Sequence, residues 1–250
     1  MLARGKLCEV WRATVDTGAV VALKIPRRDQ RRHPGAAALI RREFRVLEGL
    51  SHVHVLKTLG LIDFDGMPAL MTEYLAGGDL VPLLGADPRH WVTGARDVAL
   101  ALVYLHERDL VHRDLKARNV LYSASGEARL VDFALATVVD GKAPQGGLTT
   151  AYARLAQRQG ALPAAADDVH AFAVLLYELL AGRLPFGVNP SLETLQSGPS
   201  KPIVLRDGAD PGLQTLADLV EEALNPERRS APGSVRPFVD VLESIISDYE

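Results

Sequence analysis

The stretch VHRDLKARNVLY, residues 111–122, places a dense set of charged and polar side chains directly ahead of a short apolar run. Asp114 and Asn119 are separated by four residues, and a second acid, Asp132, follows in RLVDFALA (129–136) after a hairpin-like turn at SASGEA (123–128). A carboxylate and an amide are the oxygen ligands that Mg²⁺ takes when phosphates complete its shell. The remaining carboxylate could receive a proton. The sequence therefore predicts that these side chains converge on one edge of the fold.

Composition is that of an ordinary globular chain. The 250 residues are 48% hydrophobic and 24% charged, and 28 basic against 31 acidic side chains give a net charge of -3. This length suits one large domain or two modest lobes, and the charge gives no indication of a nucleic-acid partner. Oligomeric state is left open.

A single cysteine, Cys8, excludes an intrachain disulfide and a four-cysteine zinc site. A reducing compartment fits this usage best. No apolar stretch reaches the roughly 18 residues of a membrane span, and the first residues lack a signal-peptide core. We therefore expect a cytoplasmic protein.

Two early segments each carry a charged residue among apolar neighbours. GAVVALKI (18–25) alternates as a strand should, with Lys24 on the face of Ala22 and the apolar set Val21, Leu23 and Ile25 on the face expected to meet a core. The segment 37–50, AALIRREFRVLEGL, has the period of an amphipathic helix. Glu43 projects from its apolar stripe, and a carboxylate there needs a cation.

The later part of the chain is predicted to be mostly helical. Strands are expected at 58–65 and 68–75, joined by the turn DGMP, and the paired glycines of LAGGDL (75–80) indicate a hinge. Residues 167–182, DDVHAFAVLLYELLAG, are apolar nearly all round, as in a buried helix, with Gly182 as its C-terminal stop.

Taken together, these motifs resemble those of the eukaryotic-type serine/threonine protein kinases, including bacterial members, along nearly the whole chain. The resemblance implies an α+β, two-lobed fold: a small β-rich N-lobe with one main helix and a larger, mostly helical C-lobe. It implies a single protein kinase catalytic domain, 1–250, with the N-lobe at 1–74, the hinge region at 75–78 and the C-lobe at 79–250.

The resemblance also implies roles for the site residues. Asp114 would be the base or orienter for the substrate hydroxyl, beside Lys116 of the serine/threonine signature. Asn119 and Asp132 would hold Mg²⁺. Lys24, paired with Glu43, would hold the ATP phosphates, Thr72 would be the gatekeeper, and Leu121 would lie beneath the adenine. The residues expected to form the ATP site are Gly5, Val10, Ala22, Lys24, Glu43, Thr72, Glu73, Leu75, Leu121 and Asp132. His112 would be structural, and Asp168 would cap its helix and brace the catalytic loop.

Three features depart from the family pattern. Of the three glycines of the phosphate loop, LARGKLCEV (2–10) keeps only Gly5. Ala134 replaces the glycine after Asp132-Phe133, which should restrict backbone movement there. The segment TTAYARLAQRQG (149–160) lacks Ala-Pro-Glu: Ala156 stands at the position of the glutamate, and the arginine that would pair with it remains as Arg229. This third departure puts the substrate-docking platform in doubt more than the ATP site.

Three functions are compatible with this pattern. An active kinase that transfers the γ-phosphoryl group of ATP to Ser or Thr of a protein substrate accounts for the full catalytic set. A nucleotide-binding pseudokinase scaffold accounts for the departures, and a small-molecule kinase accounts for the altered platform. Thr149 or Thr150 could accept a regulatory phosphate that Arg113 anchors, or Thr149 could instead contact Asp114 and Lys116.

Overall fold

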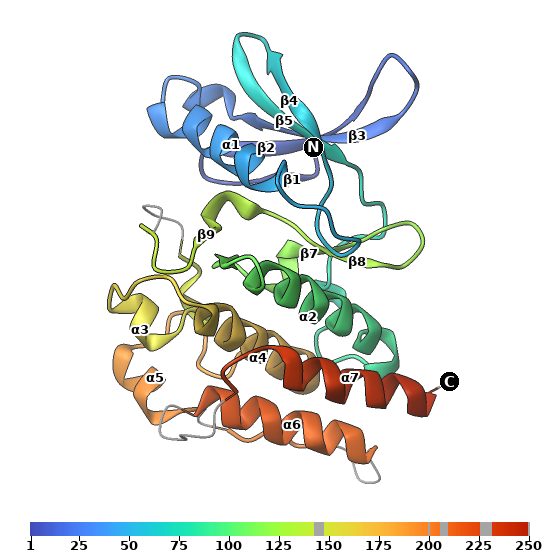
Figure 1. Ribbon diagram of the computed structural model, residues 1–250, viewed down its shortest axis with the longest axis vertical. Helices are drawn as coiled ribbons and strands as arrows, with labels where there is room; N and C mark the ends of the chain where they lie inside the picture. The colour runs from blue at the N-terminus through green and yellow to red at the C-terminus, as the bar shows by residue number, and fades with distance from the viewer. Residues whose placement is uncertain (143–147, 200, 206–209, 226–231, 250) are drawn as a thin grey trace.

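The chain folds into a small sheet-containing part stacked on a larger helical part, as the computed structural model in Figure 1 shows. The structure describes residues 1–142, 148–199, 201–205, 210–225 and 232–249. The predicted two-lobed α+β architecture is confirmed. Within the described residues, no helix combines the length and the apolar character that a membrane crossing requires.

The upper part is built on an antiparallel sheet in the order β1-β2-β3-β5-β4. Its strands are β1 (Ala3–Arg4), β2 (Cys8–Thr14), β3 (Val20–Pro26), β4 (Thr58–Phe64) and β5 (Met67–Glu73). The turn between β4 and β5 uses Asp65 and Gly66, both at positive φ (56° and 75°), as a two-residue hairpin of this twist requires. The strands predicted at 58–65 and 68–75 are thus present.

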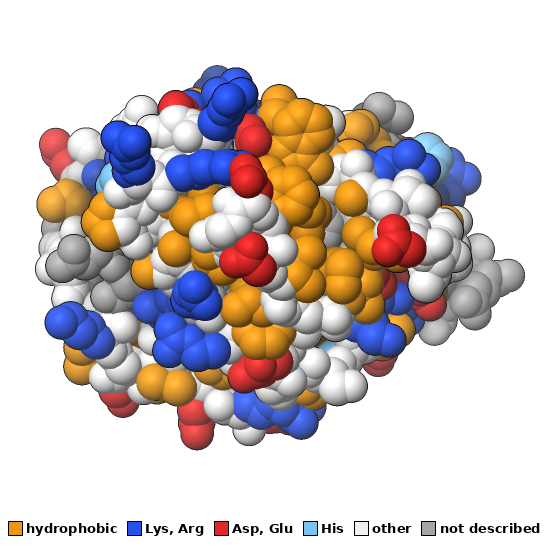
Figure 2. Space-filling view, turned by 90° about the horizontal axis from the view of Figure 1, so that it is seen from above, with side chains coloured by type: hydrophobic (Ala, Val, Ile, Leu, Met, Phe, Trp, Pro, Cys, Tyr) orange, Lys and Arg blue, Asp and Glu red, His pale blue; other side chains and the backbone are white. Residues whose placement is uncertain are grey.

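The two faces of this sheet differ in what covers them. Val21 and Leu23 are buried as predicted, but Ile25 is only half-buried. Leu23 pairs with the exposed Trp11 across β2, so this set lies on the open face instead of meeting the main core. Seen from above in Figure 2, apolar side chains form a band across the molecule.

The helix α1 (Pro34–Leu47) covers the other face, the face of Lys24. It begins three residues earlier than predicted, because His33 caps it by accepting the Gly35 N–H at 3.1 Å and Pro34 starts the first turn. Ile40 and Leu47 are buried on its inner side, and Glu43 lies between them with 1% of its surface exposed.

The lower part consists of helices around a buried centre, with short strand pairs at its upper edge. The helices are α2 (Val92–His106), α3 (Leu155–Arg158), α4 (Ala165–Ala181), α5 (Leu192–Ser197), α6 (Pro211–Leu224) and α7 (Arg236–Tyr249). The strand pairs are β6 (Leu110–Val111) with β9 (Thr137–Val138), and β7 (Val120–Tyr122) with β8 (Ala128–Leu130). Single 3-10 turns are η1 (Arg28–Gln30), η2 (Val81–Leu83), η3 (Pro88–His90), η4 (Ala117–Asn119), η5 (Phe133–Leu135) and η6 (Thr150–Tyr152).

Helix α4 is the buried helix that the sequence predicts. Phe172 and Tyr177 are fully buried, and Gly182 ends the helix at φ 66°. The predicted cap is displaced by one residue: Asp167, not Asp168, accepts the N–H of Ala164 at 3.2 Å. Asp168 is thereby left to contact the loop that carries Asp114.

The chain that connects the two parts forms backbone hydrogen bonds with β7. Gly77 donates to the Tyr122 carbonyl at 2.8 Å, and Tyr122 donates to the Gly78 carbonyl at 2.9 Å. A Cβ at Gly77 would lie 2.6 Å from the Cβ of Tyr122, so this close approach requires glycine. The paired glycines therefore lie on the connection that runs from the sheet to the helical part.

Candidate active site

Three charged side chains from distant positions meet between the two parts. Lys24 Nζ on β3 donates to Glu43 Oε2 on α1 at 2.6 Å and to Asp132 Oδ1 at 2.8 Å, spanning 19 and 108 residues of chain. The Glu43 side chain is 2% exposed, that of Lys24 15% and that of Asp132 39%. The predicted cation for the buried carboxylate is therefore Lys24, and Asp132 lies at the solvent side of the same cluster.

Charge pairing sets the ionisation of this cluster. Burial would lower the pKa of Lys24, but Asp132 and Glu43 outweigh burial and hold it above its ordinary value. Burial raises the pKa of Glu43 above the ordinary value, with Lys24 opposing the shift. Burial also acts against ionisation of Asp132, but the charge of Lys24 prevails and its pKa lies below the ordinary value. Asp132 is therefore an anion at neutral pH.

A second cluster gathers around Asp114. Lys116 Nζ donates to Asp114 Oδ2 at 2.7 Å, and Asn119 Nδ2 donates to the same oxygen at 2.9 Å and to the Asp114 carbonyl at 2.7 Å. Thr149 Oγ1 donates to Asp114 Oδ1 at 2.6 Å and accepts from Lys116 at 3.2 Å. Of the two roles considered for Thr149, the structure thus shows the contact with Asp114 and Lys116.

The loop that carries Asp114 is held from below by α4. Asp168 is fully buried and accepts the N–H groups of His112 and Arg113, each at 2.8 Å. His112 is also fully buried, and its Nε2 lies 3.1 Å from the Val131 carbonyl. The expected bracing by Asp168 and the expected structural role of His112 are both seen.

Backbone geometry at Asp132 explains why Ala134 is accommodated. Asp132 itself takes the left-handed conformation (φ 64°, ψ 71°), and Phe133–Leu135 form the 3-10 turn η5. Alanine is at ease in such a turn, so the β-carbon of Ala134 causes no strain in this conformation. Phe133 is fully buried and packs edge-on against His112, 4.8 Å between ring centroids.

The residues expected to surround a nucleotide lie on adjacent strands. Val10 pairs with Lys24, and Ala22 pairs with Thr72, so these four share one face of the sheet. Leu75 is buried where the chain leaves β5, and the half-buried Leu121 on β7 forms a bridge with Asp79 just beyond the hinge. Strand register thus groups Val10, Ala22, Lys24 and Thr72 on one face of the sheet, and Leu121 lies on β7 beside the connection between the two parts.

Residues 1–227 match the family model of the protein kinase domain. The chain belongs to this family. It is 30% identical over 259 aligned positions to serine/threonine-protein kinase pkn2 of Myxococcus xanthus, which covers 96% of this chain and 31% of the relative. It is 35% identical over 200 positions to CBL-interacting protein kinase 4 of Oryza sativa subsp. japonica, covering 74% of this chain and 44% of the relative. It is also 32% identical over 218 positions to receptor-interacting serine/threonine-protein kinase 3 of Homo sapiens, covering 77% and 42%. The chain thus spans less than half the length of each of these relatives.

The donor set of this kinase domain suits the cofactors of the family, ATP and Mg²⁺. Asp132 has a second carboxylate oxygen beyond the one that contacts Lys24, and Asn119 uses only its amide nitrogen in the hydrogen bonds described above. Two hard oxygen ligands are what a Mg²⁺ ion shared with phosphates needs. Within the described residues, no group of three or more His, Cys, Asp or Glu could hold a metal by itself.

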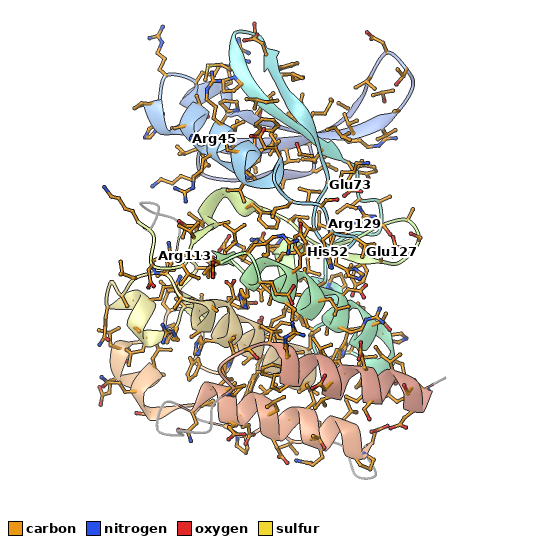
Figure 3. All side chains as sticks on the ribbon, viewed as in Figure 1. Arg45, His52, Glu73, Arg113, Glu127 and Arg129 are labelled. Atoms are coloured by element: carbon orange, nitrogen blue, oxygen red, sulfur yellow. The ribbon has the colours of Figure 1, made fainter. Side chains whose placement is uncertain are left out.

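Sequence reasoning missed a contact that ties the hinge to the lower part. The carboxylate of Glu73 accepts from Arg129 Nη1 on β8 at 2.6 Å for each oxygen, and it also accepts the Lys57 N–H at 2.7 Å. Figure 3 shows Glu73 and Arg129 close together at this junction. The side chain of Glu73 is therefore engaged, and its N–H donates to the Lys57 carbonyl at 3.1 Å. Its carbonyl accepts from Thr72 Oγ1 at 3.2 Å and has a second lone pair, which is left for the predicted nucleotide contact.

The phosphate loop is held by an arginine for which the sequence suggested no role. Arg27 Nη1 donates to the carbonyls of Gly5 and Lys6 at 3.2 and 3.3 Å. The Gly5 N–H donates to the Cys8 carbonyl at 2.8 Å, so in this conformation the loop is closed on itself. Cys8 is buried, with its Sγ 4.0 Å from the Ala36 carbonyl on α1.

The segment 149–160, which follows Asp132 in the chain, also contacts the helical part through its side chains. Thr150 Oγ1 donates to Asn189 Oδ1 at 2.7 Å, and the Tyr152 hydroxyl donates to Glu178 on α4. Arg229, the arginine expected to have lost its glutamate partner, lies outside the described residues.

Proposed function

We propose that this chain is an ATP- and Mg²⁺-dependent kinase domain that transfers the γ-phosphoryl group to a serine or threonine hydroxyl of a protein substrate. In this proposal residues 1–250 form one catalytic domain, with the N-lobe at 1–74, the hinge region at 75–78 and the C-lobe at 79–250. The observation that carries the proposal is the bridge that Lys24 makes between Glu43 and Asp132, 19 and 108 residues away.

The nucleotide side of the proposal rests on charge. Lys24 would hold the phosphates of ATP, because its two carboxylate partners keep it charged and fix its position. Asp132 and Asn119 would hold Mg²⁺, which when bound neutralises the charge of the phosphates. Val10, Ala22, Leu75 and Leu121 would enclose the adenine, with the backbone of Glu73 and Leu75 as its polar contacts and Thr72 beside it.

The acceptor side rests on Asp114. Its carboxylate already accepts from Lys116, Asn119 and Thr149, so it is held in one orientation. A substrate hydroxyl placed against it would be oriented by donating its proton toward Asp114. Lys116 lies beside this carboxylate and would stabilise negative charge that develops on the transferred group. Catalysis would then consist mainly of positioning and electrostatic stabilisation.

The choice of serine and threonine is supported by Lys116 in HRDLKARN and by relatives whose names include serine/threonine-protein kinase. The scaffold alternative drew on the incomplete glycine loop, on Ala134 and on the missing Ala-Pro-Glu, and of these Ala134 occupies a conformation without strain. Among the residues that the structure describes, no contact in the site favours the scaffold or the small-molecule alternative.

The experiment is a radiolabelled ATP transfer assay on a generic protein substrate with and without Mg²⁺, beside a thermal shift with Mg²⁺-ATP. Wild type should transfer label only with Mg²⁺. Asp114→Asn should lose roughly 100-fold or more in transfer rate while keeping the thermal shift. Asp132→Asn should lose both. Stabilisation of the wild type by Mg²⁺-ATP with no transfer to any protein would overturn the proposal in favour of the scaffold.

A further inference from the structure

The segment 149–160 lacks the glutamate expected at position 156, where the chain has Ala156, and it must be held by other contacts. Thr149 and Thr150 tie its start to Asp114 and Asn189, and three later side chains also tie it to the rest of the lower part. Tyr152 donates to Glu178 on α4, and Arg158, on α3, donates to the Pro190 carbonyl ahead of α5. Between them in sequence, Arg154 forms the ion pair on which the inference rests.

Arg154 pairs with an acid in the buried part of the molecule. Its Nε donates to Asp167 Oδ1 at 3.0 Å, and the side chain of Asp167 is 1% exposed while that of Arg154 is 32% exposed. The second oxygen of Asp167 accepts the N–H of Ala164 and caps α4. Within the described residues, Arg154 is the one cation that pairs with Asp167. A buried carboxylate depends strongly on such a partner.

The neighbouring acid on the same helix turn holds the catalytic loop. Asp168 accepts the N–H groups of His112 and Arg113, directly before Asp114. Asp167 and Asp168 therefore fix two different loops to the start of α4, the helix that runs through the middle of the lower part in Figure 1. Thr149 already ties the start of the segment to Asp114 at 2.6 Å, and Asp167 and Asp168 tie its later part and the loop of Asp114 to the same turn of α4.

We propose that Arg154 is a positioning residue that takes over the anchoring role of the absent glutamate: its ion pair with Asp167 holds the substrate-docking segment in register with Asp114. The ion pair is well suited to this, because a charge-assisted bond to a buried carboxylate is both strong and directional. It connects the segment to α4 from a position two residues before Ala156. The inference rests on the proposed kinase function for its kinetic consequences only.

The kinetic test compares Arg154→Ala with Arg154→Lys in peptide phosphorylation. Loss of the ion pair should raise KM for the peptide about tenfold or more, while KM for ATP stays within about twofold, since the ATP site is held by other contacts. Lysine keeps the charge and should restore most of the peptide affinity. Arg236→Ala is the matched control, because Arg236 pairs with Glu107 on the exposed surface of the same part. An unchanged peptide KM in Arg154→Ala would overturn the inference, and so would equal losses for peptide and ATP.

A second measurement does not depend on activity. Amide hydrogen exchange across residues 149–160 should be faster in Arg154→Ala than in wild type and should return toward wild type in Arg154→Lys. If wild type transfers no phosphate, the proposed function fails. The comparison of exchange rates still shows whether Arg154 anchors the segment. If Arg154→Ala does not fold, Arg154→Gln takes its place in both measurements. Exchange in the segment that is the same in every variant would refute the anchoring.

Discussion

Replacing Lys24 by methionine tests the charged cluster through stability as well as activity. The substitution keeps an unbranched chain but leaves Glu43, 1% exposed, without its cation. Breaking a buried ion pair by removing one partner costs about 3–5 kcal/mol. The side chain of Asp132 is 39% exposed and can be solvated, so loss of its ion pair with Lys24 adds little to the destabilisation. We therefore expect the free energy of unfolding to fall by about 3 kcal/mol, at the lower end of that range.

The assay is urea denaturation of four proteins followed by phosphate transfer. Lys24→Met/Glu43→Leu removes both charges, and it should be more stable than Lys24→Met alone because no buried anion is left. Both variants should lack transfer. Lys57→Met is the matched control: Lys57 is exposed, and its side chain should contribute less than about 0.5 kcal/mol.

The stability of Lys24→Met should also depend on pH, in a direction that follows from the pKa of Glu43. Burial already raises the pKa of Glu43, and without Lys24 the folded value rises further above the unfolded one. A carboxyl group with a raised folded pKa binds a proton more readily in the folded state, so Lys24→Met should gain stability as the pH falls from 7 toward the ordinary glutamate pKa. A loss below about 1 kcal/mol in Lys24→Met, or a double variant no more stable than the single one, would refute the reasoning.

Two further predictions concern α4. Burial, followed by the charge of Arg154, lowers the pKa of His170 from 6.5 to about 4. The unfolded chain therefore binds a proton first as the pH falls, and the domain should lose roughly 2 kcal/mol between pH 7 and pH 5 through this residue. In urea denaturation, His170→Leu should lose less stability than wild type between pH 7 and pH 5. If both proteins lose the same amount, the role assigned to His170 is wrong. Asp168→Asn should destabilise the domain by about 1–3 kcal/mol, because its amide cannot accept from both His112 and Arg113. It should also lower kcat with little change in KM for ATP, and a fully active variant would show that the loop does not need this brace.

The sequence predicts those parts of the fold and site that depend on local pattern. Alternation placed Lys24 on a strand, and helical spacing placed Glu43 on the inner side of α1. Because a buried carboxylate needs a cation, the helical pattern alone indicates that Glu43 has a basic partner, and resemblance to the kinases indicated which one. Helix α4 and its stop at Gly182 follow from composition alone.

The contacts that were missed are made by arginines whose partners are chosen by the tertiary structure. Arg27 reaches the loop at Gly5, Arg129 reaches Glu73, and Arg154 reaches Asp167. Each arginine has acids or carbonyls nearby in sequence that are equally plausible partners. An arginine side chain is long enough to reach several of them, and the packing of the strands and helices determines which one it contacts. The start of α1 was missed for a different reason: His33 caps the helix, and histidine is not a usual cap.

The departures from the family pattern show that the effect of a substitution depends on the conformation of its position. Ala134 was expected to restrict the backbone, yet the positive φ of this turn falls on Asp132, and Ala134 lies in a 3-10 turn that alanine adopts freely. Cys8 replaces a loop glycine and fills space against α1, where burial raises the pKa of its thiol to about 11 and keeps it neutral. Ala156 removes an acid from the docking segment, but Arg154 provides a different ion pair from the same segment. A missing motif residue therefore predicts lost function only where no neighbouring side chain can make an equivalent contact, and here the neighbouring contacts are present.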